Sequence, residues 1–231
     1  MTNANPFAQR STLEYELPPF AQIKEEHYLP AFYEGCAEHL VEVQAILDTP
    51  GAATFENTIV ALEKSGQYLG RMMRVFYNKS SSDTNDALDA IEEEIAPKSA
   101  AHQDAISLNP VLFKRIKDLY DARESLGLNS EDAWLLERYF KDLIHKGAHL
   151  TEAQRVRLKE LNEELSSLQT QFSKNVLADT NDLAVLVDSA EELDGLSENQ
   201  IAAAKAAAQD RGHDDKWLIG MVNFTGNPVL D

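Results

Sequence analysis

The stretch 151–179 carries an apolar stripe with the period of an α-helix. Its apolar residues recur every three or four positions: Leu158, Leu161, Leu165, Leu168, Phe172 and Val176. This spacing puts them on one face of a helix. Thr151, with Gln154 three positions later, is the pattern of a capping box that starts it. A helix of this length would run roughly 40 Å, and helix propensity alone stabilises it weakly. We therefore expect the stripe to pack against helices from the first 150 residues.

Composition limits the class of protein and its partners. The 231 residues, 43% of them hydrophobic, are enough for one large domain or two small ones. With 21 basic and 39 acidic side chains the net charge is −18, which repels phosphate backbones and anionic lipid head groups. Nucleic acid and membrane surfaces are therefore not expected partners. The lone cysteine, Cys36, allows no intramolecular disulfide. The sequence shows neither a signal-peptide pattern nor an apolar run of membrane-spanning length, so we expect a soluble cytoplasmic protein.

Residues 1–26 are expected to form an extended N-terminal arm. Proline fixes its own φ angle and disfavours helix in the residue before it, and the arm contains Pro6, Pro18 and Pro19. We expect Leu17 and Phe20 to hold this arm against the body of the protein.

Residues 27–179 read as a helical bundle. The first helix is expected near Pro30, a favoured first-turn residue, and to end at Pro50–Gly51. A second helix is expected from Thr54 to Phe76, with Gly66 at a close crossing. Ser80, Ser81 and Ser82 then suggest a polar turn.

Further helices follow in the same bundle. A third is expected after this turn, and Pro97 should kink or break it. A fourth begins at Asn109–Pro110. A fifth is capped by Ser130, and Trp134 should face inward. Gly147 suits the left-handed residue at a helix end.

Residues 180–231 have a different pattern, which predicts a small α/β segment. The short apolar runs 183–187 and 217–222 lack helical period and predict two strands. Ser197 with Gln200 predicts a capped helix between them. Asn227–Pro228 resembles the start of another helix. The fold class is therefore mainly α, a bundle of long antiparallel helices with a two-strand element near the C-terminus.

The most tempting site motif is His145-Lys146-Gly147-Ala148-His149. Two histidines four apart on a helix can bind zinc, and HExxH metallopeptidases add a glutamate as general base. Here Lys146 stands in the glutamate position, and Gly147 breaks the helix that this geometry needs. A structural role is therefore favoured over a metal site. The other histidines are isolated in sequence and are interpreted as surface or hydrogen-bonded side chains: His27, His39, His102 and His213.

Other chemically capable residues also favour structural interpretations. The run Glu92–Glu94 is expected on a solvated helix face, because consecutive residues point in different directions. Cys36 lies on an apolar stripe and is interpreted as a buried hydrophobe. The serines at 80–82 lack the G-x-S-x-G pattern of a nucleophile. Asn175 interrupts the long apolar face and suggests a buried hydrogen bond or a register device. We predict no catalytic, cofactor-binding or metal-binding residue in this chain.

Several segments together resemble one enzyme family. They are Thr54-Phe55-Glu56-Asn57-Thr58 with Leu62 and Gly66, the run LKELNEEL at 158–165, Phe172 with Asn175-Val176-Leu177, and NFTGNPVL at 223–230. In order and spacing they resemble the N-terminal part of the thimet-oligopeptidase-like zinc metallopeptidases, nearest to the bacterial peptidyl-dipeptidase and oligopeptidase A branch. The resemblance covers nearly the whole chain.

The resemblance implies a helical, two-lobed enzyme with a deep channel that admits short peptides. Its zinc would be held by an HExxH helix and a later glutamate, all in a C-terminal catalytic region. This chain would then be a non-catalytic lobe, inactive alone, whose partners are that region and peptide substrates. The alternative is a stand-alone helical scaffold or protein-interaction module without catalysis.

Overall fold

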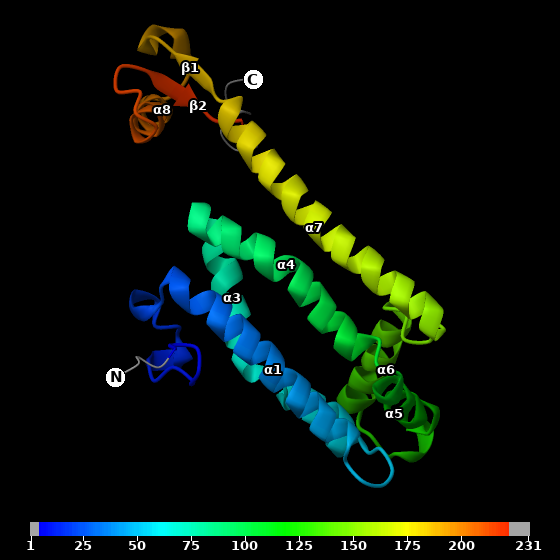
Figure 1. Cartoon of the computed structure of the whole chain (residues 1–231). Helices are drawn as coiled ribbons and strands as arrows, with labels where there is room; N and C mark the ends of the chain where they lie inside the picture. The colour runs from blue at the N-terminus through cyan, green and yellow to red at the C-terminus, as the bar shows by residue number, and fades with distance from the viewer. Residues whose placement is uncertain (1–4, 222–231) are drawn as a thin grey trace. The chain divides into compact units, whose positions relative to one another are not determined.

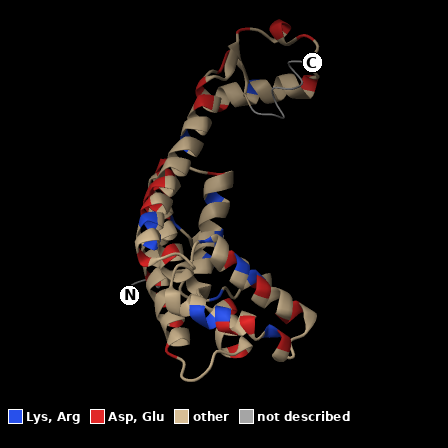
Figure 2. Cartoon of the chain, turned by 90° about the vertical axis from the view of Figure 1, so that its right-hand side faces the viewer, with Lys and Arg blue, Asp and Glu red and all other residues tan. Residues whose placement is uncertain are grey.

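The computed structural model describes residues 5–221 and divides into two compact units. The units are Met1–Leu168 and Gln169–Asp231, and their boundary falls inside the long helix α7 (Glu152–Asp182). The sequence placed a boundary at 179, near the end of that helix. The described residues form helices and one two-stranded sheet, which confirms the mainly α fold class (Figure 1). Acidic residues are spread over the helices of both units (Figure 2).

Helices α1 (Tyr28–Leu47) and α3 (Gln67–Ser82) form the centre of the first unit, with α4 (Asp86–Ser107) packed against both (Figure 1). Helices α1 and α3 approach each other closely at Gly35, where an added Cβ would lie 2.9 Å from the Cα of Leu69. The close approach expected at Gly66 is confirmed as well, since an added Cβ there would lie 2.9 Å from the His39 ring on α1. The core around it contains large, fully buried side chains: Phe32, Met72, Phe76, Leu88 and Ile95.

The helix expected from Thr54 to Phe76 is interrupted. A π-helical turn (Phe55–Val60) and the short α2 (Ala61–Lys64) precede α3. Gly66 separates α2 from α3 with a left-handed backbone (φ +67°), a conformation that glycine adopts without steric cost. The Thr54 cap is confirmed, since its hydroxyl accepts a hydrogen bond from the Asn57 amide at 3.1 Å.

Two other boundaries differ from the sequence-based expectations. Ser80–Ser82 form the last turn of α3 and not a loop, and the Ser82 hydroxyl donates to the carbonyl of Asn78 at 2.6 Å. Helix α4 continues through Pro97, so the expected break there is wrong. Burial of Ile95 and Ala96 beside the proline supplies tertiary packing that keeps this helix continuous.

Helices α5 (Pro110–Asp121) and α6 (Ser130–His145) enclose a second core. Its largest fully buried side chains are Ile59, Leu112, Ile116 and Leu136. Asn109 caps α5 as expected, but α6 is capped by Asn129 and not by Ser130. Trp134 is 62% exposed, which contradicts its inward assignment. Leu136, two positions later, is buried instead.

The N-terminal arm is anchored by Phe7. Three short 3-10 turns shape the arm: Glu14–Glu16, Phe20–Gln22 and Glu25–His27. Phe7 is buried in the first core with its ring 5.5 Å from that of Tyr28, and Arg71 donates to its carbonyl at 3.1 and 3.2 Å. The expected anchors, Leu17 and Phe20, are exposed.

The apolar stripe of α7 is not core in the first unit. Leu161, Leu165 and Leu168 are 43–60% exposed, and no residue of α7 is buried. Only Leu158, at the start of the stripe, is half-buried, beside Gly147. The helix also contacts this unit through another face, where the Asn162 amide donates to both carboxylate oxygens of the buried Asp104 at 2.9 Å. The expectation that the stripe packs on the first 150 residues is therefore wrong for these three leucines.

In the second unit, α8 (Glu198–Asp210) packs against β2 (Trp217–Ile219), which pairs antiparallel with β1 (Val185–Val187). Ala204, Ala208 and Leu218 are buried there. The capping box of Ser197 and Gln200 is confirmed. The helix start proposed at Asn227–Pro228 lies outside the described residues. Among the described helices, none combines the length and apolarity needed to cross a bilayer.

We predict that Leu165→Ala changes the free energy of unfolding by less than about 0.5 kcal/mol, because this side chain is already half exposed. The control Leu136→Ala removes a fully buried leucine and should cost roughly 2–5 kcal/mol. Urea unfolding followed by circular dichroism measures both. A large loss of stability in Leu165→Ala would show that the stripe is core after all.

Candidate functional site

The His145–His149 motif does not lie on one helix. Helix α6 ends at His145, and Gly147 has a left-handed backbone (φ +90°) between the two exposed histidines. Within residues 5–221, no group of three or more histidine, cysteine, aspartate or glutamate side chains is placed to hold a metal ion. These residues therefore do not fit the zinc centre implied by the family resemblance. That the chain contains no site residue stays a prediction.

The other sequence candidates occupy ordinary structural positions. Glu94 accepts a hydrogen bond from the Tyr33 hydroxyl and pairs with Lys98, which lowers the pKa of its carboxyl. Burial raises the pKa of the Cys36 thiol to about 11, which makes it a poor nucleophile. Asn175 is exposed and accepts from Gln171 at 2.9 Å, so a buried hydrogen bond at this position is wrong.

Two histidines that look isolated in sequence meet inside the first unit. His39 on α1 and His102 on α4 lie with Nδ1 and Nε2 only 3.0 Å apart. The other ring nitrogen of His39 lies 3.2 Å from the Ser65 hydroxyl, and that hydroxyl donates to the Leu62 carbonyl at 2.7 Å. We call Ser65, His39 and His102 the histidine chain. It links α1 and α4 to the break between α2 and α3.

The hydrogen bonds of the histidine chain define its tautomers. Because the Ser65 proton is directed to the Leu62 carbonyl, Nε2 of His39 must donate to the Ser65 oxygen. Nδ1 of His39 is then an acceptor, and Nε2 of His102 donates to it. The remaining nitrogen, Nδ1 of His102, is buried without a partner. A further proton would have to enter that buried position, so burial lowers the pKa of His102, assisted by His39.

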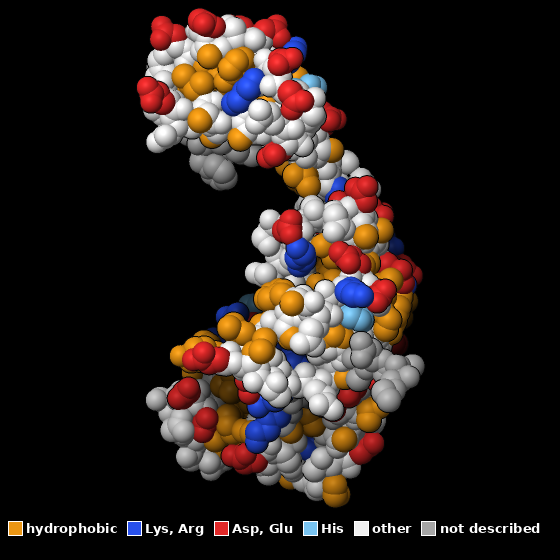
Figure 3. All heavy atoms as spheres, turned by 90° about the vertical axis from the view of Figure 1, so that its left-hand side faces the viewer, with side chains coloured by type: hydrophobic (Ala, Val, Ile, Leu, Met, Phe, Trp, Pro, Cys, Tyr) orange, Lys and Arg blue, Asp and Glu red, His pale blue; other side chains and the backbone are white. Residues whose placement is uncertain are grey.

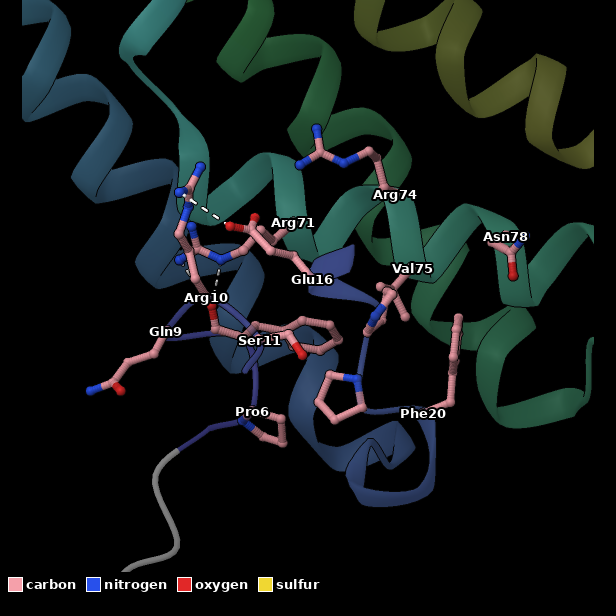
Figure 4. Close-up of a pocket in the computed structure, with 13 residues that line it drawn as sticks. Pro6, Gln9, Arg10, Ser11, Glu16, Phe20, Arg71, Arg74, Val75 and Asn78 are labelled. Carbon is pink, nitrogen blue, oxygen red and sulfur yellow. Dashed lines mark hydrogen bonds and ion pairs between the residues drawn. The ribbon is translucent and has the colours of Figure 1, made fainter. Parts of the chain in front are cut away.

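A pocket of about 470 Å³ lies between the N-terminal arm and α3, a volume within the range of small-molecule sites. Figure 4 shows its residues: Arg71, Arg74, Val75 and Asn78 come from α3, and Arg10, Glu16 and Phe20 come from the arm. We call it the arm pocket. On the face of the first unit drawn in Figure 3, basic side chains lie beside apolar surface.

The arm pocket carries an excess of positive charge. Arg10 pairs with Glu16 at 3.3 Å. Arg71 donates to neutral acceptors, the carbonyls of Phe7 and Ala8, and its guanidinium lies 5.7 Å from the centroid of the Tyr68 ring. Arg74 makes no hydrogen bond or ion pair with any residue in the described part of the chain. Three guanidinium groups therefore share the pocket with a single carboxylate, in a chain whose net charge is −18.

Sequence reasoning did not identify either feature. His39 and His102 are 63 positions apart, and no local pattern joins them. Arg71 and Arg74 did offer a signal, because two arginines one turn apart flank apolar residues on a helix of an acidic chain. The contribution of the arm depended on where Phe7 anchors it, which the sequence alone did not specify.

The curated proteins that this chain resembles are peptidases, of the dipeptidyl carboxypeptidase and oligopeptidase A kinds. It is 40% identical over 230 residues to dipeptidyl carboxypeptidase of Escherichia coli, and 38% identical over 228 residues to that of Salmonella typhimurium. It is 28% identical over 195 residues to oligopeptidase A of Escherichia coli. These matches confirm the resemblance noted in the sequence.

The matches cover nearly all of this chain but only part of each relative. They include 100% of the chain and 34% of the Escherichia coli dipeptidyl carboxypeptidase, and 84% of the chain and 29% of the oligopeptidase A. The chain thus spans about a third of the length of the curated relatives it matches. No family model matches the chain.

We predict that stability falls on acidification partly through the histidine chain. Burial lowers the pKa of His39 and His102 below the ordinary value of 6.5, so the unfolded chain binds more protons as the pH drops through that value. Their contribution is complete above pH 6.5 and declines below it; Glu42 opposes the shift at His39. Melting temperatures between about pH 7.5 and about pH 5.5 measure the slope.

In this experiment His102→Gln keeps a donor toward His39 but removes one titrating group, so its melting temperature should depend less on pH. The matched control is His149→Gln, at an exposed histidine, which should retain the parent slope. Equal slopes for all three proteins would exclude a contribution from the histidine chain.

Proposed function

We propose that this chain is the non-catalytic helical lobe of a cytoplasmic zinc metallopeptidase that hydrolyses short oligopeptides. The observation that carries the proposal is 40% identity to a dipeptidyl carboxypeptidase across 230 residues, which make up 34% of that enzyme. Cleavage would then depend on the part of the enzyme that this chain does not match.

The chemistry of the described residues supports this division. Hydrolysis of a peptide bond needs an activated water or an activated nucleophile. The one cysteine has a raised pKa, and the HxxxH motif is split by a helix end. The zinc, its HExxH ligands and the activating glutamate implied by the family are therefore proposed to lie outside this chain. Its helices would wall a channel that restricts substrates to short, unfolded peptides.

The exposed stripe of α7 offers a surface for the rest of such an enzyme. Leu161, Leu165 and Leu168 present apolar surface in the first unit. An apolar helix face gains free energy when a partner covers it, since burial contributes about 25 cal/mol per Å². We propose that the catalytic region of the same enzyme docks on these leucines.

The test combines two purified proteins. We expect the chain alone, with or without added zinc, to leave a quenched-fluorescent oligopeptide intact. A separately made polypeptide encoded downstream in the same gene should restore hydrolysis when mixed with it. Leu165→Asp should weaken this restoration, because a charge on the stripe opposes docking, whereas Val111→Asp, at a similarly exposed valine on α5, should not.

Two results would contradict the proposal. Zinc-dependent, chelator-sensitive hydrolysis by the chain alone would reveal a catalytic site within it. A coding sequence that stops at codon 231, with a stable product and no downstream partner, would favour the alternative of a stand-alone helical scaffold.

A further inference from the structure

The two arginines of α3 place two positive charges close together in the arm pocket. Arg71 and Arg74 are separated by one helical turn, and like charges at this spacing repel each other. Arg71 is positioned by its bonds to the carbonyls of Phe7 and Ala8 and lies over the Tyr68 ring at 5.7 Å, but no carboxylate among the described residues pairs with it. Arg74 has no partner among the described residues. An anion bound at this pocket would relieve the repulsion.

The remaining walls restrict the kind of anion. Phe20, Pro18 and Pro19 of the arm line the pocket together with Val75 of α3, so much of the lining is apolar. A small inorganic anion would leave this surface uncovered. A carboxylate attached to an apolar group matches both the arginines and the apolar lining. Guanidinium groups bind carboxylates through paired hydrogen bonds, and the apolar group covers the aromatic wall.

The arm side of the pocket is organised without a ligand. Phe7 is buried in the core, and the Asn5 amide donates to the His27 carbonyl at 2.8 Å. Arg71 holds the backbone of this segment from the α3 side. Because these contacts hold the arm side of the pocket in place before a ligand binds, binding requires little further ordering of the arm.

We propose that the arm pocket binds the free C-terminal carboxylate of a short peptide. The carboxylate lies at Arg74 and Arg71, and the last side chain of the peptide packs between Phe20 and Val75. That the carboxylate comes from a peptide rests on the proposed function, whereas the carboxylate itself is inferred from the charges and walls of the pocket.

The test is calorimetric titration of this chain with acetyl-glycyl-phenylalanine and with the amide of the same compound. We expect the acid to bind at least about tenfold more tightly, as removal of a charged hydrogen-bond partner typically costs. The net charge of −18 repels anions in general, so a preference for the acid must arise locally. Inorganic phosphate, which lacks an apolar group, should bind more weakly than the acid.

Arg74→Gln is the decisive variant, because Arg74 is exposed and makes no hydrogen bond or ion pair with the described residues. It should weaken binding of the acid by about tenfold and leave the amide unchanged. The matched control is Arg138→Gln, which changes the net charge equally at an exposed arginine on α6 and should bind as the parent does. Phe20→Ala should weaken the acid and leave phosphate unchanged.

Three outcomes would overturn the inference: no binding at millimolar concentrations, equal binding of acid and amide, or binding insensitive to Arg74→Gln. Phosphate binding as tightly as the acid would overturn the assignment of an apolar carboxylate. These are binding measurements on the chain alone, so they can fail while the two-protein hydrolysis experiment succeeds. The reverse result would reject the proposed function and retain a carboxylate site.

Discussion

The hydrogen bonds between Asn162 and Asp104 determine which face of α7 meets the first unit. The carboxyl group of Asp104 is buried on α4, and a buried carboxylate without partners would be strongly destabilising. Both of its oxygens accept from the Asn162 amide at 2.9 Å. With Asn162 turned toward α4, the leucines at 161, 165 and 168 present apolar surface elsewhere. One polar contact thus leaves an apolar stripe available to a partner.

This orientation connects the fold with the proposed function. The two cores of the first unit are filled by other helices and by Phe7 of the arm, so the unit does not need the α7 stripe to close them. The Escherichia coli dipeptidyl carboxypeptidase is about three times as long as this chain, and the proposal is that the corresponding further polypeptide covers the stripe. The arm pocket lies in the same unit and would give a non-catalytic lobe a direct contact with peptide.

Local signals in the sequence predicted the fold better than they predicted the sites. Caps such as Asn109 and Ser197 were predictable because their hydrogen bonds join residues two or three positions apart. The periodicity of α7 showed that one helix face is apolar but not which way that face is turned. Its orientation depends on the contact of Asn162 with Asp104, 58 positions away. The histidine chain and the arm pocket depend on contacts across 63 or more positions, for which no periodicity exists.

Thiol labelling of Leu165→Cys tests the orientation of α7 most directly. Cys36 is the only native cysteine, and burial raises the pKa of its thiol to about 11, so it provides a slow internal reference in every sample. Because the stripe is exposed, the new cysteine should react with a maleimide under native conditions much faster than Cys36. Equal, slow labelling of both thiols until denaturant is added would show that the stripe is buried, and would contradict the account.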